Sequence, residues 1–593
     1  MRKRRDRATG TGAPVEAEIF AGRDRLTAVA PVVSDQVVVK IGDLLVRRGS
    51  VTQSQVSEAI LQQSASGKRL GTLLVELGAL DELELARTLA EQRGFRLADL
   101  RHETPDDAAI ALLPESVARA HTALPMRVKD TELEVAMADP LDRNAVAEIK
   151  GSTERNVIPL IAPASDLHRA IERSYRALSA VERHVEAFLA TEAITSPTFT
   201  PDATAADSAP VVQVLNLIIT QAARDRASDV HIEPQDSRVR IRYRIDGALH
   251  DVLALPSNMG PAVVSRLKVL ADMNIVERRK PQDGQIAMEV EGRPLDIRVA
   301  TTSTIWGEKA VLRLLDKSRT LFRLNELGME PETHQRFSRL IHAPFGMVIC
   351  AGPTGSGKTT TLYASVSEIN QSELNVMTVE DPVEYILPSV NQIQIHDQGG
   401  ISFASGLKAI LRQDPDVILV GEMRDVETAR IGIQSALTGH LVLTSLHATD
   451  AAGALQRFID MEIEPFLVAS SVLAVVGQRL VRRICRFCKV PYTPSVEEHR
   501  YYVQAGGPYK QEFWRGEGCN FCFGTGYEDR MGVYELLEIT EEVKRLLMRK
   551  APHDELRALA VSEGMRTLQD AGVRLVADDV TTISELVRAI YTT

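Results

Sequence analysis

The stretch Met347-Val-Ile-Cys-Ala-Gly-Pro-Thr-Gly-Ser-Gly-Lys-Thr359 decides the fold of this chain. Its first five residues form an apolar run of strand length, and the residues from Thr359 to Ile369 are compatible with a helix. The pattern GxxxxGK(S/T) lies between them, in the strand-to-helix setting in which this pattern binds phosphate. A glycine-rich turn that binds nothing is the alternative, and the flanking strand and helix argue against it.

The residue types of this turn suit a bound triphosphate. Backbone N–H groups can wrap around phosphate oxygens where side chains are missing, and the dipole of the following helix favours the anion. The lysine adds a point charge at the β- and γ-phosphates, and the threonine hydroxyl can reach Mg²⁺. We therefore predict that ATP is bound by Gly352, Pro353, Thr354, Gly355, Ser356, Gly357, Lys358, Thr359 and Thr360.

Two further apolar runs of strand length lead to acidic residues. Residues 376–379 are followed by an acidic segment that ends at Glu384, and residues 417–420 are followed by Gly421 and Glu422. Because parallel strands end at the same edge of a sheet, we expect these carboxylates near the phosphates. One should hold Mg²⁺ through its water shell, and another should orient the attacking water. Acidic residues that merely cap strands are the alternative.

Histidines stand at both ends of a third predicted strand, residues 441–444. His440 precedes it and His447 follows it closely. Histidines at strand ends are usually structural, but beside a nucleotide an imidazole could sense the γ-phosphate. Both interpretations stay open.

Two CxxC pairs indicate a metal site. Cys485 and Cys488 form the first pair and Cys519 and Cys522 the second, with 30 residues between the pairs. In the reducing cytosol such pairs are metal sites more often than disulfides. Four thiolates suit tetrahedral Zn²⁺ in a structural role, because no ligand position stays open. Four unconnected buried thiols are the alternative, and the fifth cysteine, Cys350, belongs to the core.

The composition indicates a soluble chain of several domains. It has 593 residues, of which 44% are apolar and 25% charged. The net charge of −11 gives no basic footprint for nucleic acid, which disfavours a nucleic-acid translocase. No apolar segment follows the basic residues Met1–Arg7, so we expect no export signal. The longest apolar stretch, Phe466–Val476, is predicted to be a buried helix.

An internal repeat lies near the start of the chain. Residues 41–49, IGDLLVRRG, recur as residues 70–78, LGTLLVELG, at an offset of 29 residues. Each copy predicts a helix, a glycine-centred turn and a second helix. Further helices and strands of this first domain are predicted at residues 133–137, 141–150, 157–161 and from Ala164. The segment 191–210 is poor in apolar residues and predicts a flexible linker.

The sequence predicts two domains of different kinds after the linker. A helix at 211–224, strands at 239–245 and 295–299 and a helix near 262–271 predict a small mixed α/β domain. From about Arg323 onward, runs of strand length alternate with helical stretches, which is typical of a parallel sheet with helices on its faces.

Together these motifs resemble the secretion ATPase family, whose PilB-type and GspE-type members power type IV pilus assembly and type II secretion. The resemblance covers Val211–Thr593 and rests on GPTGSGKTTTLY from Gly352, TVEDPVEY from Thr378, LRQDPDVILVGEMRD from Leu411, TGHLVLTSLH from Thr438, GQRLVRRIC from Gly477, ASDVHIEP from Ala227, RYRIDG from Arg242 and RKPQDGQ from Arg279. It implies an α/β fold: a RecA-like P-loop ATPase domain, a small PAS-like α/β domain, a four-cysteine zinc subdomain and a mainly helical N-terminal domain.

The resemblance also implies roles for single residues. Lys358 and Thr359 would bind phosphate and Mg²⁺, Glu422 would complete the Mg²⁺ shell, and Glu384 would activate the water. His447 keeps its place in the family motif. A neighbouring subunit or domain would bring arginines to the phosphates. The candidates are Arg242, Arg244, Arg279 and Arg298, for which an exposed ladder of salt bridges is the alternative.

The 29-residue repeat resembles the MshE-type N-terminal domain, which binds cyclic di-GMP. The resemblance implies leucines that pack the guanines, and glycines and two cations that meet the phosphates. The residues in these places are Lys40, Gly42, Leu44, Leu45, Arg69, Leu70, Gly71, Leu73 and Leu74. The family favours Arg and Leu where Lys40 and Ile41 stand. A purely structural docking domain for a membrane platform protein is the alternative.

The sequence thus predicts seven segments: a disordered basic head (1–36), an MshE-type domain (37–176), a helix and linker (177–210), a PAS-like domain (211–322), an ATPase core (323–480), a zinc subdomain (481–530) and a C-terminal helical region (531–593).

We expect a cytoplasmic homo-hexamer at the inner face of the cytoplasmic membrane that uses ATP, Mg²⁺ and Zn²⁺, and cyclic di-GMP if the repeat binds it. Its expected partners are an inner-membrane platform protein and a cytoplasmic docking protein, with no nucleic acid. Pilus assembly is the main functional hypothesis. A type II secretion ATPase and a nucleotide-sensing scaffold with a silent P-loop are the alternatives.

Overall fold

The computed structural model describes residues 40–175, 181–194, 210–316, 322–370, 372–396 and 399–590. The described residues up to Gly94 form one compact unit, and those from Phe95 onward form a second. The predicted basic head lies outside the described residues. So does most of the predicted linker segment, of which helix α9 (Val181–Ile194) is described.

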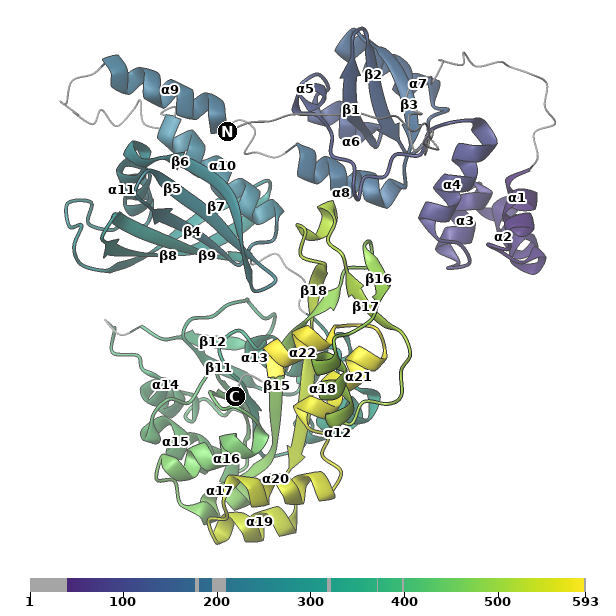
Figure 1. Cartoon of the computed structure of the whole chain (residues 1–593). Helices are drawn as coiled ribbons and strands as arrows, with labels where there is room; N and C mark the ends of the chain where they lie inside the picture. The colour runs from purple at the N-terminus through teal and green to yellow at the C-terminus, as the bar shows by residue number, and fades with distance from the viewer. Residues whose placement is uncertain are drawn as a thin grey trace, which may run out of the picture. The chain divides into compact units, whose positions relative to one another are not determined.

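Four helices build the first unit, in the two helix–turn–helix copies that the repeat predicts (Figure 1). Gly49 and Gly78 make the turns, with φ of 75° and 68°, a backbone region that favours glycine. Gly71 lets two helices approach closely, because a Cβ there would lie 2.6 Å from the Leu85 side chain. The helices are α1 (Ile41–Arg48), α2 (Gln53–Ser66), α3 (Leu70–Glu76) and α4 (Glu82–Arg93).

The second unit begins with a small α/β domain around a three-stranded sheet of order β1-β2-β3. β1 pairs antiparallel with β2, and β2 pairs parallel with β3. Strand β1 and the short helices before it were not predicted from the sequence. The elements are α5 (Asp107–Ile110), α6 (Glu115–Ala120), β1 (Ala123–Lys129), β2 (Glu132–Met137), α7 (Arg143–Thr153), β3 (Asn156–Ile161) and α8 (Ala164–Ser174).

The next domain carries a six-stranded antiparallel sheet of order β6-β5-β4-β9-β8-β7. Alternate residues of β5 are buried, and its Tyr243 hydroxyl donates to the Ile218 carbonyl at 2.6 Å, so helix α10 covers this face. The elements are α10 (Pro210–Arg224), β4 (Asp229–Pro234), β5 (Arg238–Ile245), β6 (Ala248–Pro256), η2 (Ser257–Met259), α11 (Gly260–Leu270), β7 (Gln282–Val290), β8 (Arg293–Thr304) and β9 (Gly307–Asp316).

A seven-stranded sheet of order β12-β11-β13-β14-β10-β15-β18 forms the core of the next domain. All its pairings are parallel except β15 with β18. The elements up to β15 are η3 (Leu324–Glu326), α12 (Pro331–Ile341), β10 (Gly346–Ala351), α13 (Lys358–Ile369), β11 (Val376–Glu380), β12 (Asn391–Gln394), α14 (Phe403–Ile410), β13 (Val417–Val420), α15 (Val426–Leu437), β14 (Leu441–Leu446), α16 (Ala451–Asp460), α17 (Pro465–Ser471) and β15 (Val472–Ile484).

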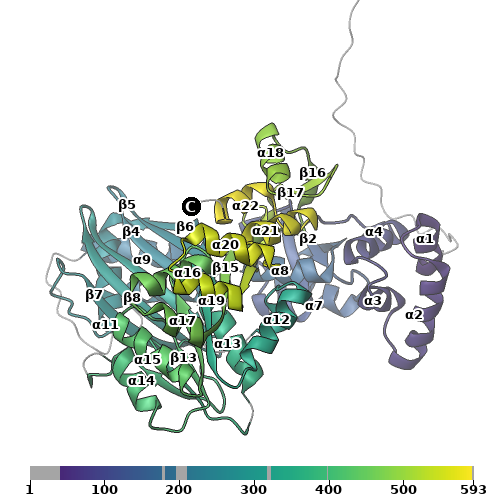
Figure 2. The same cartoon turned by 90° about the horizontal axis from the view of Figure 1, so that it is seen from below.

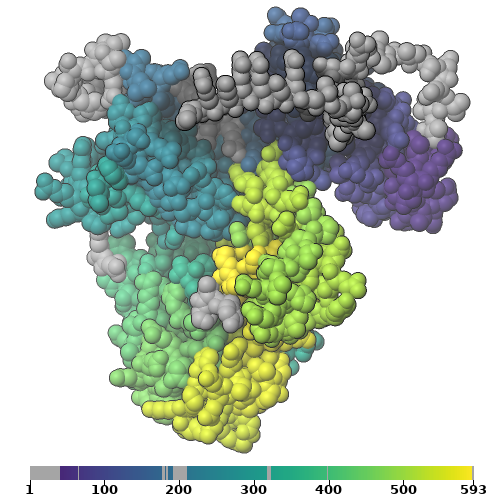
Figure 3. All heavy atoms as spheres, in the orientation of Figure 1, coloured from purple at the N-terminus to yellow at the C-terminus, as the bar shows by residue number. Residues whose placement is uncertain are grey.

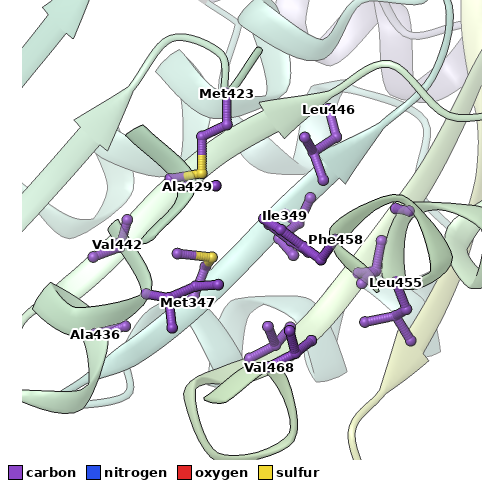
Figure 4. Packing of buried hydrophobic residues seen from close by; sticks show 14 of the residues in the cluster. Met347, Ile349, Met423, Ala429, Ala436, Val442, Leu446, Leu455, Phe458 and Val468 are labelled. Carbon is purple, nitrogen blue, oxygen red and sulfur yellow. The ribbon is translucent and has the colours of Figure 1, made fainter. Parts of the chain in front are cut away.

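Helices cover both faces of this sheet. Met347 and Ile349 of β10 point to one face and pack with residues of α14 to α17, among them Phe458 (Figure 4). Val348 and Cys350 point to the other face, where α12 and α13 lie. All six residues of β10 are buried, as a central parallel strand requires. The substitution Phe458→Ala in such a core would lower the free energy of unfolding by about 3–5 kcal/mol.

The prediction of one buried helix over Phe466–Val476 is wrong. Helix α17 ends at Ser471, and β15 starts at Val472 and pairs with β10 and β18. The valines of this stretch are β-branched and fit a pleated strand better than a helix. Phe466, at the start of α17, is 53% exposed. No helix among the described residues is long and apolar enough to span a membrane.

The cysteine pairs lie on an excursion between β15 and β18. It holds β16 (Lys489–Tyr492), α18 (Val496–Gln504), β17 (Phe513–Gly516) and η5 (Asn520–Cys522), and β16, β17 and α18 stand together in Figure 2. The predicted C-terminal helical region opens on a strand, since β18 (Tyr527–Glu538) returns to the core sheet before the helices α19 (Glu541–Met548), α20 (His553–Ser562), α21 (Leu568–Ala577) and α22 (Ile583–Ile590). Helices α19 and α20 pack against the core domain, because Val543, Leu547 and Leu556 belong to its hydrophobic cluster. In Figure 3 the yellow C-terminal part lies directly beside the green core.

Candidate functional site

The predicted phosphate loop joins β10 to α13, as its strand-to-helix setting requires. Gly355 and Gly357 have φ of 77° and 89°, which side chains rarely adopt. A Cβ on Gly352 would lie 2.4 Å from the Ser356 Oγ and 2.7 Å from the Gln478 carbonyl. The glycines are therefore needed for the shape of the loop itself.

Lys358 is the first residue of α13, and its side chain folds back into the loop. Its Nζ donates to the Gly352 carbonyl at 2.9 Å and to the Pro353 carbonyl at 3.0 Å. Burial lowers the pKa of this ammonium group, and the charge of Glu422 opposes that shift. The lysine thus holds a partly desolvated positive charge at the centre of the loop.

Gln478 supports the loop from β15, a role that the sequence did not single out. Its Nε2 donates to the Ser356 carbonyl at 2.9 Å, and its Oε1 accepts from the Thr361 hydroxyl at 2.9 Å. The available signal was its place in the quoted GQRL motif, but only the pairing of β15 with β10 brings it under the loop.

The carboxyl ends of β13 and β14 bring Glu422 and His447 together. Val420 pairs with Thr444, and each is the last residue of the apolar run predicted for its strand. The His447 Nε2 lies 3.4 Å from a Glu422 carboxylate oxygen, and Arg424 forms an ion pair with the same carboxylate. His440 lies at the amino end of β14, where its Nδ1 contacts the Ser435 carbonyl at 3.0 Å. Of the two histidines, His447 is at the edge that carries the phosphate loop.

Glu380, the last residue of β11, and Glu384, four residues further on, have different surroundings. Glu380 is buried and accepts hydrogen bonds from Tyr363, from the Thr378 hydroxyl at 2.5 Å and from Gln392 at 3.1 Å. Its oxygens are thus engaged within the fold. Glu384 is half-buried, and burial raises the pKa of its carboxyl.

Two of the four predicted arginines pair within their own sheet, and a third is exposed on a connection. Arg242 donates to Glu233 at 2.8 Å, and Arg244 lies 3.5 Å from Asp229, which matches the salt-bridge alternative. Burial alone would raise the pKa of Glu233, but hydrogen bonds, first of all from Arg242, lower it to about 2. Arg279 is exposed, on the connection between α11 and β7.

Arg298 is the predicted arginine whose charge reaches the edge. Burial lowers the pKa of its guanidinium, and the carboxylate of Glu384 opposes that shift. Arg313 of β9 is the register partner of Arg298, and its charge also acts on the pKa of Glu384. Its Nε donates to Asp229 at 3.1 Å within its own sheet as well. Arg313 is not among the residues predicted from the sequence, because strand register cannot be read from the segment that contains it.

The four cysteines of the two pairs converge, as predicted. All four sulfurs lie within 4.8 Å of one another, and the pairs Cys485–Cys519 and Cys488–Cys522 are 3.9 and 3.8 Å apart. Thiolates arranged as a tetrahedron about 2.3 Å from Zn²⁺ would be about 3.8 Å apart, so the cluster fits this ion. Cys350 lies apart in β10, where burial raises the pKa of its thiol to about 12.

The repeat residues divide into two groups in the first unit. Lys40 and Arg69 are exposed and occupy equivalent places, immediately before α1 and α3. Leu44 and Leu70 are half-buried. The remaining predicted ligand residues belong to the interior of the unit: Gly42, Leu45, Gly71, Leu73 and Leu74 are buried, and Leu45, Leu73 and Leu74 are part of its hydrophobic core. In this structure these three leucines pack the unit itself rather than a surface for guanine.

Comparison with known proteins decides the family. A family model described as "Type II/IV secretion system protein" matches residues 204–588. The chain belongs to the type II/IV secretion system protein family. A second family model, the MshEN domain, matches residues 93–181 of this family member and leaves the 29-residue repeat ahead of the matched segment.

Two relatives of this secretion ATPase span nearly its whole length. "Type IV pilus assembly ATPase PilB" of Myxococcus xanthus is 39% identical over 557 residues, which cover 92% of this chain and 98% of the relative. "Type II secretion system protein E" of Xanthomonas campestris is 39% identical over 563 residues, covering 93% and 98%. A solved structure titled "Structure of MshE with cdg" aligns with 23% of this chain and 99% of its own at 35% identity, with a TM-score of 0.22.

The predicted family, fold class and enzyme class are confirmed: the chain is a P-loop ATPase of this family, with an MshEN domain ahead of the motor.

Proposed function

We propose that this chain is the motor ATPase of type IV pilus assembly, which couples ATP hydrolysis to the polymerisation of pilin at the inner membrane. The observation that carries the proposal is the carboxyl edge of the core sheet. A glycine-shaped loop with the buried Lys358 ammonium, the Glu422–His447 pair and Glu384 all follow strands that end there.

Each of these residues takes one task in hydrolysis. The backbone amides of the loop and Lys358 bind the β- and γ-phosphates. Thr359 and Glu422 would hold Mg²⁺, which when bound neutralises charge on the phosphates. Glu384 orients the attacking water and accepts its proton, a task that its raised pKa suits because a base is most effective near the working pH. His447 holds Glu422 in place and senses the γ-phosphate.

Arg298 and Arg313 stabilise the negative charge of the transferring phosphoryl group. Their charges already act on Glu384, which supports this role. Of the other candidates, Arg242 and Arg244 serve the sheet of their own domain, and Arg279 is exposed and suits a contact with a neighbouring subunit. The cysteine cluster holds one Zn²⁺ in a structural role.

The motor works as a homo-hexamer in the cytoplasm, at the inner face of the cytoplasmic membrane. It acts there on a platform protein and with a cytoplasmic docking protein. The names of the relatives support this setting, since they are pilus assembly and secretion ATPases. Light scattering of the purified chain with an ATP analogue should give the mass of six subunits. A monomer at every concentration would reject the hexamer.

Type II secretion is the second candidate function, because a relative with that name matches at the same identity as the pilus ATPase. A deletion strain distinguishes the two. Loss of surface pili with normal protein secretion, restored by the wild-type gene but not by Lys358→Ala, supports pilus assembly. Loss of secretion with normal pili supports the second candidate. If the chain is instead a nucleotide-sensing scaffold, the gene with Glu384→Gln, which keeps nucleotide binding, should restore the phenotype as well as the wild-type gene does.

We also propose that the repeat binds cyclic di-GMP through its exposed cations. Lys40 and Arg69 open the two copies and would meet the phosphates, and the half-buried Leu44 and Leu70 would contact the guanines. Titration of the full chain by calorimetry should show binding that Arg69→Ala weakens. Arg87→Ala is the control, since Arg87 is exposed on α4 and pairs with Glu84. The absence of heat at high ligand concentration would leave the domain a docking role.

A further inference from the structure

The two cysteine pairs present aromatic side chains to a domain that is far away in the sequence. Each CxxC carries a phenylalanine at its third position, Phe487 and Phe521, and their rings meet edge to face with centroids 5.0 Å apart. Phe521 packs against the hydrophobic core of the domain at residues 95–175, which we call the front domain. The cysteine cluster and the front-domain core therefore share one side chain.

Asn520 adds hydrogen bonds to the same contact. It lies between Cys519 and Phe521, and its backbone N–H donates to the Arg101 carbonyl at 2.9 Å. Its side-chain Nδ2 donates to the carbonyls of Leu100 and Glu103 at 3.2 and 3.1 Å. Three donors on one residue thus recognise one backbone turn of the front domain.

Arginines of the front domain surround the phenylalanines. The guanidinium groups of Arg101 and Arg169 lie 5.4 and 4.6 Å from the centre of the Phe487 ring, within the range of cation–π attraction. Arg101 also donates to the Phe487 carbonyl at 3.5 Å, and Arg169 forms an ion pair with Glu528.

The second cysteine pair reaches a further domain through Phe523. Arg173 of the front domain lies 4.0 Å from the centre of the Phe523 ring. The same ring lies 5.5 Å from that of His250 and packs against the core of the domain that contains α10 and α11. Phe521 and Phe523, on either side of Cys522, therefore contact two different domains.

We propose that the cysteine centre is a metal-fixed joint, whose recognition surface of Phe487, Asn520, Phe521 and Phe523 docks the front domain onto the motor of the same chain. The inference goes beyond the proposed function, which needs only a structural metal. Asn520 and Phe521 lie between two ligands, Cys519 and Cys522, so the ion fixes the positions of both contact residues. Loss of the ion would free the segment and with it the front domain.

Hydrogen–deuterium exchange of the full chain tests this joint. Asn520→Ala removes two side-chain hydrogen bonds but no cysteine. We expect amide exchange in peptides covering residues 99–104 and 519–524 to become about tenfold faster. The zinc content should stay at the wild-type value. Gln511→Ala is the control, because Gln511 is exposed in the same excursion and bonds only locally, to Tyr509.

Two outcomes would overturn the proposal. Unchanged exchange in both peptides of Asn520→Ala would mean that the contact does not hold the front domain. Loss of zinc in this variant would mean that Asn520 serves the metal site instead. Cys519→Ser extends the test to the ion: exchange at residues 99–104 should rise while peptides of β2 and β10 stay protected. Continued protection of residues 99–104 without the ion would reject the metal dependence.

Discussion

The His447 Nε2 lies 3.4 Å from a carboxylate oxygen of Glu422, at the sheet edge that also carries the phosphate loop. Because β13 and β14 are parallel neighbours, the segments that follow them begin at the same edge of the sheet, where these two side chains meet. We propose that the pair links Glu422, which would hold Mg²⁺, to His447 as a sensor of the γ-phosphate.

His447→Ala should therefore lower kcat by about tenfold or more while the KM for ATP changes little, since the contact serves the transition state more than binding. Steady-state turnover at saturating ATP measures this. His440→Ala is the control, because His440 contacts the Ser435 carbonyl at the opposite end of β14. Equal losses in both variants would assign His447 a structural role only.

The pH dependence of turnover should reveal Glu384. Burial raises the pKa of its carboxyl, and the charge of Arg298 opposes this. Only the ionised carboxylate can accept a proton, so activity is lost as the pH falls through this raised pKa. The acid limb of kcat should lie above pH about 4.5, the range of an exposed glutamate. Arg298→Gln should move the limb to still higher pH, and an unmoved limb would assign it to another group.

Stability should depend on pH through His553 and Asp450. The His553 Nε2 lies 2.9 Å from both Asp450 oxygens; burial alone would lower the pKa of this imidazole, but the hydrogen bonds to Asp450 and Asp554 raise it. A raised pKa in the folded state means that the stabilisation is complete below pH about 6.5 and is lost as the pH rises through the folded-state value. His553→Gln should thus lower Tm at about pH 6 and leave it unchanged at about pH 9. Equal decreases of Tm at both pH values would show that the charge interaction between His553 and Asp450 is not the cause.

The zinc content of two cysteine variants should show that the four clustered cysteines bind the metal and that Cys350 does not. We expect about one zinc per chain by elemental analysis, and loss of it in Cys485→Ser, because a site with three thiolates binds far more weakly. Cys350→Ala should keep the metal, since Cys350 belongs to β10 and not to the cluster. Full zinc in Cys485→Ser would contradict the four-cysteine site.

The sequence predicted the local structure around the candidate site well where its residues lie in contiguous motifs. The phosphate loop, the acids after β11 and β13 and the doubled CxxC were all found because residue spacing within one turn or one strand end is fixed by local geometry. The helices of the repeat followed from their periodicity and their turn glycines.

What the sequence could not supply depends on strand pairing and on which face is buried. Gln478 reaches the phosphate loop only because β15 pairs with β10, and Arg313 joins Arg298 through strand register. The valine-rich stretch after Ser471 has the apolar content of a buried helix, and only its place between two strands makes it a strand. The sequence of the repeat does not show whether Leu45 packs in the core, as it does here, or faces a bound ligand.

We propose that ATP is hydrolysed at the carboxyl edge of the core sheet, with Glu384 as the group that activates water. Glu384→Gln keeps the shape of this side chain and removes its basicity. The most direct measurement is Mg²⁺-dependent ATP turnover of the purified full chain, with ATP affinity measured in parallel. We predict a loss of kcat on the order of 10²–10³-fold with affinity within about threefold of the wild type. Wild-type turnover by Glu384→Gln would mean that Glu384 does not activate the water.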